Sequence, residues 1–140
     1  MLATAGTLLS AAVTVLTVFL GLHAMMLVGR MRGKHGVLAP SVSGAPEFER
    51  AFRVQMNTLE QSVLFLPVLW LATIYPVVSG YLAPGLGLIW LIGRILYTSG
   101  YMAEAAKRSS GFLIAGIAFL GLLLLSIIGI IHAWLVTRPA

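Results

Sequence analysis

Three polar residues lie at helical spacing just ahead of a long apolar run. Arg53, Asn57 and Glu60 are spaced i, i+4 and i+7, which places them on one stripe of a helix. Arg50 lies one turn earlier on the same stripe, and the apolar run "QSVLFLPVLWLATIYPVV" follows at once. Polar groups that enter an apolar environment face the interior of a bundle, where they are paired or bind a ligand. The spacing therefore predicts either a ligand site or an internal brace between Arg53 and Glu60.

A second polar stripe lies later in the chain. Arg94, Tyr97, Tyr101 and Arg108 follow one another at i, i+3, i+7 and i+14, again on one side of a helix. We expect the two stripes to lie at the same end of adjacent helices and to line one pocket. Arg94 is the deepest of the set, and either a structural ion pair or hydrogen bond or a part in catalysis fits its position.

The chemistry of such a pocket selects its ligand. Guanidinium groups bind carboxylates in bidentate fashion, and a carboxylate such as Glu60 suits an ammonium group. The pocket therefore predicts a small ligand with more than one carboxylate and an amine, and an apolar second reactant that arrives from the lipid. A simpler role stays open for single residues, because Arg50 and Lys107 can reach lipid headgroups and tyrosines are common at the interface.

The composition restricts where this pocket can lie. Of the 140 residues 59% are hydrophobic and only 9% are charged, and the mean hydropathy is +1.00. A soluble domain carries about a quarter charged residues, so the chain is predicted to be a single-domain integral membrane protein over residues 1–140. The absence of cysteine excludes disulfides and thiolate–metal chemistry, and the three histidines are too far apart to form a metal site. We expect no nucleic-acid partner, because the net charge of +5 is a topology signal in a membrane protein.

Four apolar stretches predict an all-α, integral membrane four-helix bundle. The expected spans are about 5–28, 59–78, 86–102 and 112–136. The first stretch is too long for a signal peptide, and no Lys or Arg precedes it. Pro46 and Glu47 indicate that the second helix begins before the membrane, because acidic residues suit the N-terminal end of a helix. The residues between the second and third spans, "YPVVSGYLAPG", predict a tight turn.

The basic residues predict the orientation of the bundle. Seven of the nine lie in the first connection, 29–55, or the third, which share a side when there are four spans. The positive-inside rule makes this side cytoplasmic, in a bacterial inner membrane or the endoplasmic reticulum, and puts both termini and Arg138 on the other side.

Two stretches of the chain resemble a known superfamily. The stretch "EFERAFRVQMNTLE" is similar to the signature of the MAPEG superfamily, the membrane-associated proteins of eicosanoid and glutathione metabolism. The stretch "GLGLIWLIGRILYTSGYMAEAAKRSSG" most resembles microsomal glutathione S-transferase 3-like members. The resemblance implies a homotrimer of four-helix bundles. It also implies glutathione as co-substrate, bound between neighbouring subunits near the cytoplasmic face.

The same resemblance assigns roles to single residues. It implies that glutathione is held by residues of the second and third helices, with Gln55 reaching it from the adjoining subunit's side; the others are Arg53, Asn57, Glu60, Tyr97 and Tyr101. Arg108 matches the arginine that faces the thiol, and Arg32 matches a ligand-holding arginine that is also the candidate for a second catalytic cation.

The implied mechanism follows from electrostatics. A thiolate is a far better nucleophile than a thiol, and a guanidinium close to the sulfur lowers the pKa of the thiol. The thiolate attacks an electrophilic carbon to give a conjugate, or a hydroperoxide oxygen to give an alcohol. We therefore expect a membrane-bound glutathione transferase or peroxidase that acts on lipophilic electrophiles or lipid hydroperoxides.

Some positions depart from the leukotriene synthase branch of the superfamily. Gln61 stands where that branch has tyrosine, Met31 separates Arg30 from Arg32, and Gly33 falls where the proposed acid of that branch would be. These departures argue against leukotriene C4 synthesis as the specific assignment.

Two other readings of the sequence stay open. The first is a non-catalytic membrane protein of the same fold that binds and presents lipid, although the presence of Arg53 favours the enzyme. The second is a purely structural bundle packed through Gly111, Gly116 and Gly121, and we expect these glycines to pack helices in every case.

Overall fold

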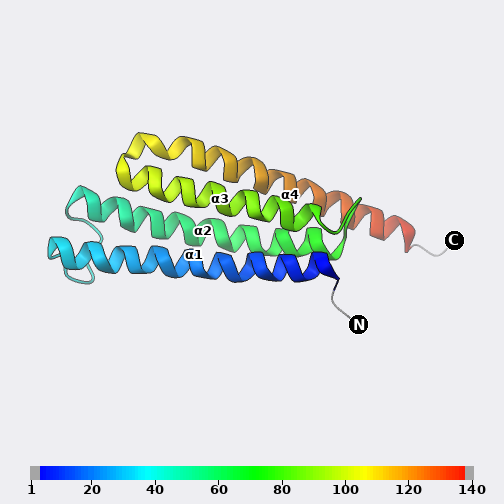
Figure 1. Cartoon of the computed structure of the whole chain (residues 1–140), viewed down its shortest axis with the longest axis horizontal. Coiled ribbons are helices and arrows are strands. Elements are labelled where there is room, and N and C mark those ends of the chain that lie inside the picture. The colour runs from blue at the N-terminus through cyan, green and yellow to red at the C-terminus, as the bar shows by residue number, and fades with distance from the viewer. Residues whose placement is uncertain (1–3, 138–140) are drawn as a thin grey trace.

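Four long helices lie side by side in the computed structural model, which describes residues 4–137 (Figure 1). The helices are α1 (Ala5–His35), α2 (Pro46–Ile74), α3 (Leu82–Ala103) and α4 (Ser109–Val136), with a short 3₁₀ helix, η1 (Ala105–Arg108), between the last two. The described residues contain no strand. The predicted all-α four-helix bundle is therefore confirmed.

Most of the predicted connection between the first two spans is helical. Residues 29–55 were expected to link the spans, and within them α1 continues to His35 and α2 begins at Pro46, so that residues 36–45 form the loop. Arg32 and Lys34 in the last turn of α1 suit the negative end of the helix, which ends at Gly36 with a φ of 64°. The apolar stretch predicts only the apolar part of α1. The helix continues beyond this stretch through a polar last turn. The early start of α2 at Pro46 was predicted correctly.

Within residues 4–137, three segments are long and apolar enough to cross a membrane. They are Ala5–His35, Leu82–Ala103 and Ala105–Val136. The helix α2 is not among them, because Asn57, Glu60 and Gln61 interrupt its apolar half, and it ends at Ile74, two residues before Pro76. The helix thus ends four residues before residue 78, the predicted end of the second span.

The connections group as predicted. Figure 1 shows that α1 begins and α4 ends at one end of the bundle, whereas residues 36–45 and 104–108 lie at the other. We call this other end the basic end; it carries Arg30, Arg32, Lys34, Arg50, Arg53, Lys107 and Arg108. Arg138 lies outside the described residues.

The core between the helices is apolar. The rings of Phe65 and Trp90 stack with their centroids 3.8 Å apart and an angle of 3° between the planes. Val13 of α1, Leu69 of α2 and Leu122 of α4 pack in the same cluster. This core holds α2 and α3 together below the basic end, so polar side chains near that end have fixed positions.

Only some of the glycines in α4 pack helices. Modelling a Cβ atom onto Gly111 would bring it against the backbone nitrogen of Tyr97 and 2.7 Å from the backbone oxygen of Gly93, whereas a Cβ atom on Gly116 would meet nothing within 4 Å. Gly121 faces Leu86, whose Cδ1 atom would lie 3.3 Å away. The expectation that all three pack helices was wrong for Gly116 within the described residues. Residues that are five positions apart in a helix lie on different sides of it, because one turn takes about 3.6 residues.

Gly111→Ala is expected to destabilise the protein by about 1–3 kcal/mol, because α3 and α4 must separate to admit the methyl group. Thermal unfolding in detergent checks this value. Gly116→Ala is the matched control and should leave the unfolding temperature unchanged or raise it, since alanine is the better helix former. Equal unfolding temperatures for the two variants would contradict the tight contact at Gly111.

A polar clamp joins α1 to α2 at the basic end. Lys34 donates a hydrogen bond to Glu47 Oε2 at 2.7 Å, and His35 Nε2 lies 2.9 Å from the same oxygen. Lys34, and after it His35, holds the pKa of the Glu47 carboxyl below its ordinary value of 4.5. Because this pKa is lowered on folding, the clamp stabilises fully above the ordinary value and is lost as the pH falls through the lowered one.

Glu47→Gln should therefore lower the unfolding temperature slightly at neutral pH, by about 1–3 °C, and the difference from the parent should vanish at acid pH well below 4.5. Thermal unfolding at both pH values is the measurement. Glu104→Gln, which removes a more exposed carboxylate from Lys107, is the control. A difference that persists unchanged in acid would show that the clamp does not act through the charge of Glu47.

Candidate functional site

The two polar stripes meet in one cavity at the basic end. This cavity, of about 620 Å³, lies between α2, the end of α3, η1 and the first turns of α4. We call it the arginine cavity; it is lined by Arg53, Asn57, Tyr97, Arg108, Ser109, Phe112 and Leu113. The structure therefore brings four of the predicted site residues together. The sequence did not single out Ser109 or Leu113; Ser109 directly follows Arg108 and Leu113 directly follows Phe112, and this was the available signal.

A second cavity adjoins the first through Arg53. It has a volume of about 490 Å³ and lies toward the loop before α2. Arg50, Tyr101 and Glu49 are among its lining residues. Glu49 accepts a hydrogen bond from the backbone nitrogen of Gly44 at 3.0 Å, so this carboxylate is already engaged. Arg53 borders both cavities, and a ligand longer than one of them can extend into the other past this side chain.

Arg108 reaches the arginine cavity by a different route from the one predicted. The i+14 spacing put it on the stripe of Arg94, although the third span was predicted to end at about residue 102; α3 ends at Ala103 and Glu104 is extended, with φ −160° and ψ 137°. The 3₁₀ turn of η1 then brings the Arg108 guanidinium back over the Tyr101 ring, 5.0 Å from its centroid. The centroids of the Tyr97 and Tyr101 rings lie 5.6 Å apart with an angle of 39° between the planes, so a tilted pair of aromatic rings lies beneath the arginine.

The predicted brace between Arg53 and Glu60 is not formed. Both side chains are exposed, and among residues 4–137 neither makes a hydrogen bond or an ion pair. Arg108 has no carboxylate partner within the same range. Two guanidinium groups from separate segments thus converge on one cavity with their charges free for a ligand. Carboxylates are the groups that guanidinium binds best.

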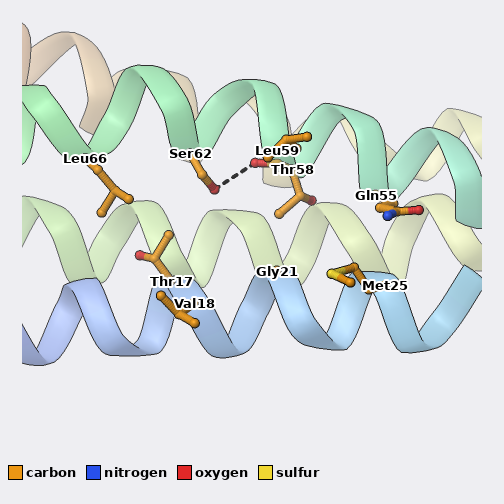
Figure 2. A pocket seen from close by; sticks show the side chains of 9 residues that line it. All are labelled: Thr17, Val18, Gly21, Met25, Gln55, Thr58, Leu59, Ser62 and Leu66. Carbon is orange, nitrogen blue, oxygen red and sulfur yellow. Dashed lines mark hydrogen bonds between the residues drawn. The ribbon is translucent and has the colours of Figure 1, made fainter.

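Three other predicted residues lie away from the arginine cavity in the single chain. Glu60 is exposed one turn further along α2. Gln55 lines a smaller cavity of about 230 Å³ between α1 and α2 (Figure 2). Arg32 lies at the end of α1, where its guanidinium is 4.9 Å from the Phe48 ring and donates to the Val37 carbonyl at 3.4 Å.

The role of Arg94, which the sequence left open, is a hydrogen-bonding one. Its side chain is 1% exposed and donates to Asn57 Oδ1 at 2.9 Å and to Thr58 Oγ1 at 2.7 Å. It makes no ion pair with any residue the structure describes. Thr58 was not predicted as a partner, although an Asn–Thr pair beside an apolar run was a signal that a donor lies nearby.

Comparisons with known proteins identify the family of the chain. A profile of the MAPEG family matches residues 10–128. The chain is 46% identical over 108 residues to an uncharacterized protein of Synechocystis, covering 77% of each chain. It is 40% identical over 129 residues to microsomal glutathione S-transferase 2 of Homo sapiens, covering 91% of this chain and 86% of that one. It is 36% identical over 127 residues to leukotriene C4 synthase of Cavia porcellus, covering 91% and 83%.

These matches confirm the resemblance to the superfamily. That the chain is most similar to microsomal glutathione S-transferase 3-like members stays a prediction. The profile covers most of the residues of all four helices, including every lining residue of the arginine cavity. The chain belongs to the MAPEG family.

Proposed function

We propose that this protein is a membrane-bound glutathione transferase that activates glutathione as a thiolate, and that the same thiolate reduces lipid hydroperoxides. The observation that carries the proposal is the convergence of Arg53 and Arg108 on one cavity without a carboxylate partner among the described residues. Its volume lies within the range of about 300–1,000 Å³ that is usual for small-molecule sites. The 40% identity to a protein named a glutathione S-transferase supports glutathione as the ligand.

Glutathione has two carboxylates, one ammonium group and one thiol, and this surface offers a partner to one carboxylate, to the ammonium group and to the thiol. Arg53 is the partner of one carboxylate, and Asn57 and the tyrosines supply further hydrogen bonds. The exposed carboxylate of Glu60 suits the ammonium group. Arg108 stands beside the thiol, where its charge favours the thiolate, and the thiol proton passes to water.

The thiolate then has two reactions. In conjugation its sulfur forms a bond to an electrophilic carbon, and the leaving group departs with the electron pair. In peroxide reduction the sulfur takes the outer oxygen of the hydroperoxide, the alcohol is released, and a second glutathione yields the disulfide and water. A lipophilic substrate reaches the cavity along the exposed side chains of Phe112 and Leu113 at the start of α4.

A homotrimer would complete the site. Gln55 and Arg32 lie on the α1 side of α2, away from the arginine cavity of their own chain. If the α1–α2 face of a neighbouring subunit packs near the cavity, its Gln55 and Arg32 reach the ligand that Arg53 holds. In that arrangement Arg32 is the second cation. The positive-inside rule places the basic end, and with it the site, toward the cytoplasm.

The test is a product assay on the purified protein in liposomes. We expect an aryl halide with glutathione to give the thioether, and a lipid hydroperoxide with glutathione to give the alcohol, both identified by mass spectrometry. Both products should be absent without glutathione and greatly reduced in Arg108→Ala. Lipid binding with neither product in the folded protein would contradict the proposal and favour the non-catalytic lipid-presenting protein.

A further inference from the structure

A buried arginine lies directly behind the arginine cavity. Arg94 of α3 is 1% exposed, and the structure contains no carboxylate for it within residues 4–137. A buried charge without a counter-ion is costly, so its hydrogen bonds must hold it in place. Its guanidinium carbon also lies 4.3 Å from the centroid of the Tyr97 ring, which lines the cavity.

Arg94 holds two consecutive residues of α2. One terminal nitrogen donates to Asn57 Oδ1 at 2.9 Å, and the other donates to Thr58 Oγ1 at 2.7 Å. Asn57 faces the arginine cavity, whereas Thr58 lines the cavity on the α1 side of the same helix (Figure 2). The guanidinium thus binds both residues at once. Its hydrogen bond to Thr58 fixes it in place while it binds the amide of Asn57.

This contact determines which end of the Asn57 amide a ligand meets. Guanidinium is only a donor, so it requires the amide oxygen as its partner. A reversed amide would place N–H groups against N–H groups. With the oxygen held by Arg94, the group that Asn57 offers to the arginine cavity is its NH₂. This group is a donor, and it suits a carboxylate or carbonyl oxygen of the ligand.

We propose that Arg94 is a positioning residue, which orients the Asn57 amide so that its NH₂ group donates to bound glutathione. This inference rests on the proposed function and adds to it a residue that does not touch the ligand. Arg94 affects the affinity for glutathione through Asn57. The hydrogen bond to Thr58 holds the Arg94 guanidinium in the position that this requires.

A double-mutant cycle on glutathione affinity tests the proposal. Arg94→Met removes the donors and keeps the side chain long and apolar, and we expect it to weaken glutathione binding about tenfold while turnover of bound glutathione changes much less. Asn57→Ala should have a similar effect. The double variant should bind like Asn57→Ala alone, within about twofold, because Arg94 has nothing left to orient.

The control is another buried side chain that links helices. Ser126 of α4 donates to the Val68 carbonyl of α2 at 3.0 Å, far from the arginine cavity. Any effect of Ser126→Ala should multiply with that of Asn57→Ala. Multiplying effects of Arg94→Met and Asn57→Ala would overturn the proposal, because Arg94 would then act independently of Asn57.

Asn57→Asp decides the question if Arg94→Met fails to fold. The carboxylate keeps Arg94 paired, so the variant should fold, but it presents an acceptor where the ligand needs a donor. We expect glutathione binding at least tenfold weaker than in Asn57→Ala, and affinity equal to that of Asn57→Ala would overturn the proposal. Failure of the unsubstituted chain to bind glutathione would overturn the proposed function itself, together with this inference.

Discussion

Arg53→Ala is expected to weaken glutathione binding by a factor of roughly 30 to 1,000. The substitution leaves a ligand carboxylate without its bidentate partner in a partly enclosed cavity, which costs about 2–4 kcal/mol. Arg53 borders both cavities at the basic end, and no other group in the described residues competes for its charge. The large effect therefore reflects direct contact with the ligand and not a loss of folding.

Calorimetric titration with glutathione measures this effect. Arg53→Lys should keep only part of the affinity, because an ammonium group keeps the charge but cannot form the bidentate hydrogen bonds of a guanidinium group. Arg30→Ala is the matched control, since Arg30 is an exposed basic residue of the same end that lines neither cavity. If Arg53→Ala binds glutathione like the parent, the site is not where we place it.

Arg108→Ala is expected to separate binding from activation. Glutathione affinity should change by less than about fivefold, whereas turnover should fall about 100- to 1,000-fold, as when one electrostatic stabiliser is removed from an active site. The pH dependence of the remaining activity should move upward, because the thiol then ionises nearer its ordinary pKa. Steady-state kinetics with an aryl halide across a pH range gives both values.

Lys107→Ala is the control for Arg108→Ala. Lys107 lies next to Arg108 in η1 and carries the same charge, but it is paired with Glu104 at 3.2 Å and lines neither cavity at the basic end. It should keep the activity of the parent. If both variants lose turnover equally, the charge of the whole segment matters, and Arg108 has no specific place at the thiol.

Periodicity predicted the parts of the site that lie within helices. The i, i+4 spacing of Arg53 and Asn57 placed both on one face of α2, and the structure shows both in the arginine cavity. Tyr97 and Tyr101 were predicted on one side of α3 in the same way, and their rings lie together. Each pair is separated by about one helical turn, and over that distance the spacing alone determines which side of the helix the side chains lie on.

Periodicity failed where the backbone leaves the helix. The i+14 spacing from Arg94 to Arg108 assumes that α3 continues to Arg108, but α3 ends at Ala103, Glu104 is extended and η1 follows. Arg108 reaches the cavity because the chain turns back toward Tyr101, which spacing cannot show. The same limit applies to the end of α1, where the cap at Gly36 and the basic last turn extend the helix into a region that hydropathy assigns to a connection.

Side-chain partners were the least predictable part. Asn57 was identified as a ligand-binding residue, but its oxygen faces the interior and binds Arg94. The predicted ion pair between Arg53 and Glu60 would neutralise both charges, yet both side chains are exposed in the single chain. A helical stripe is wide enough to include residues that face a neighbouring helix and residues that face outward, and only three-dimensional packing separates them.

The most direct measurement of the central claim is an ultraviolet difference spectrum of the purified protein as glutathione is added at neutral pH. We predict a thiolate band that saturates with glutathione in the parent and in Lys107→Ala, and that is absent in Arg108→Ala although this variant still binds glutathione. No band in a parent protein that is folded and binds glutathione would contradict the claim that this site activates the thiol.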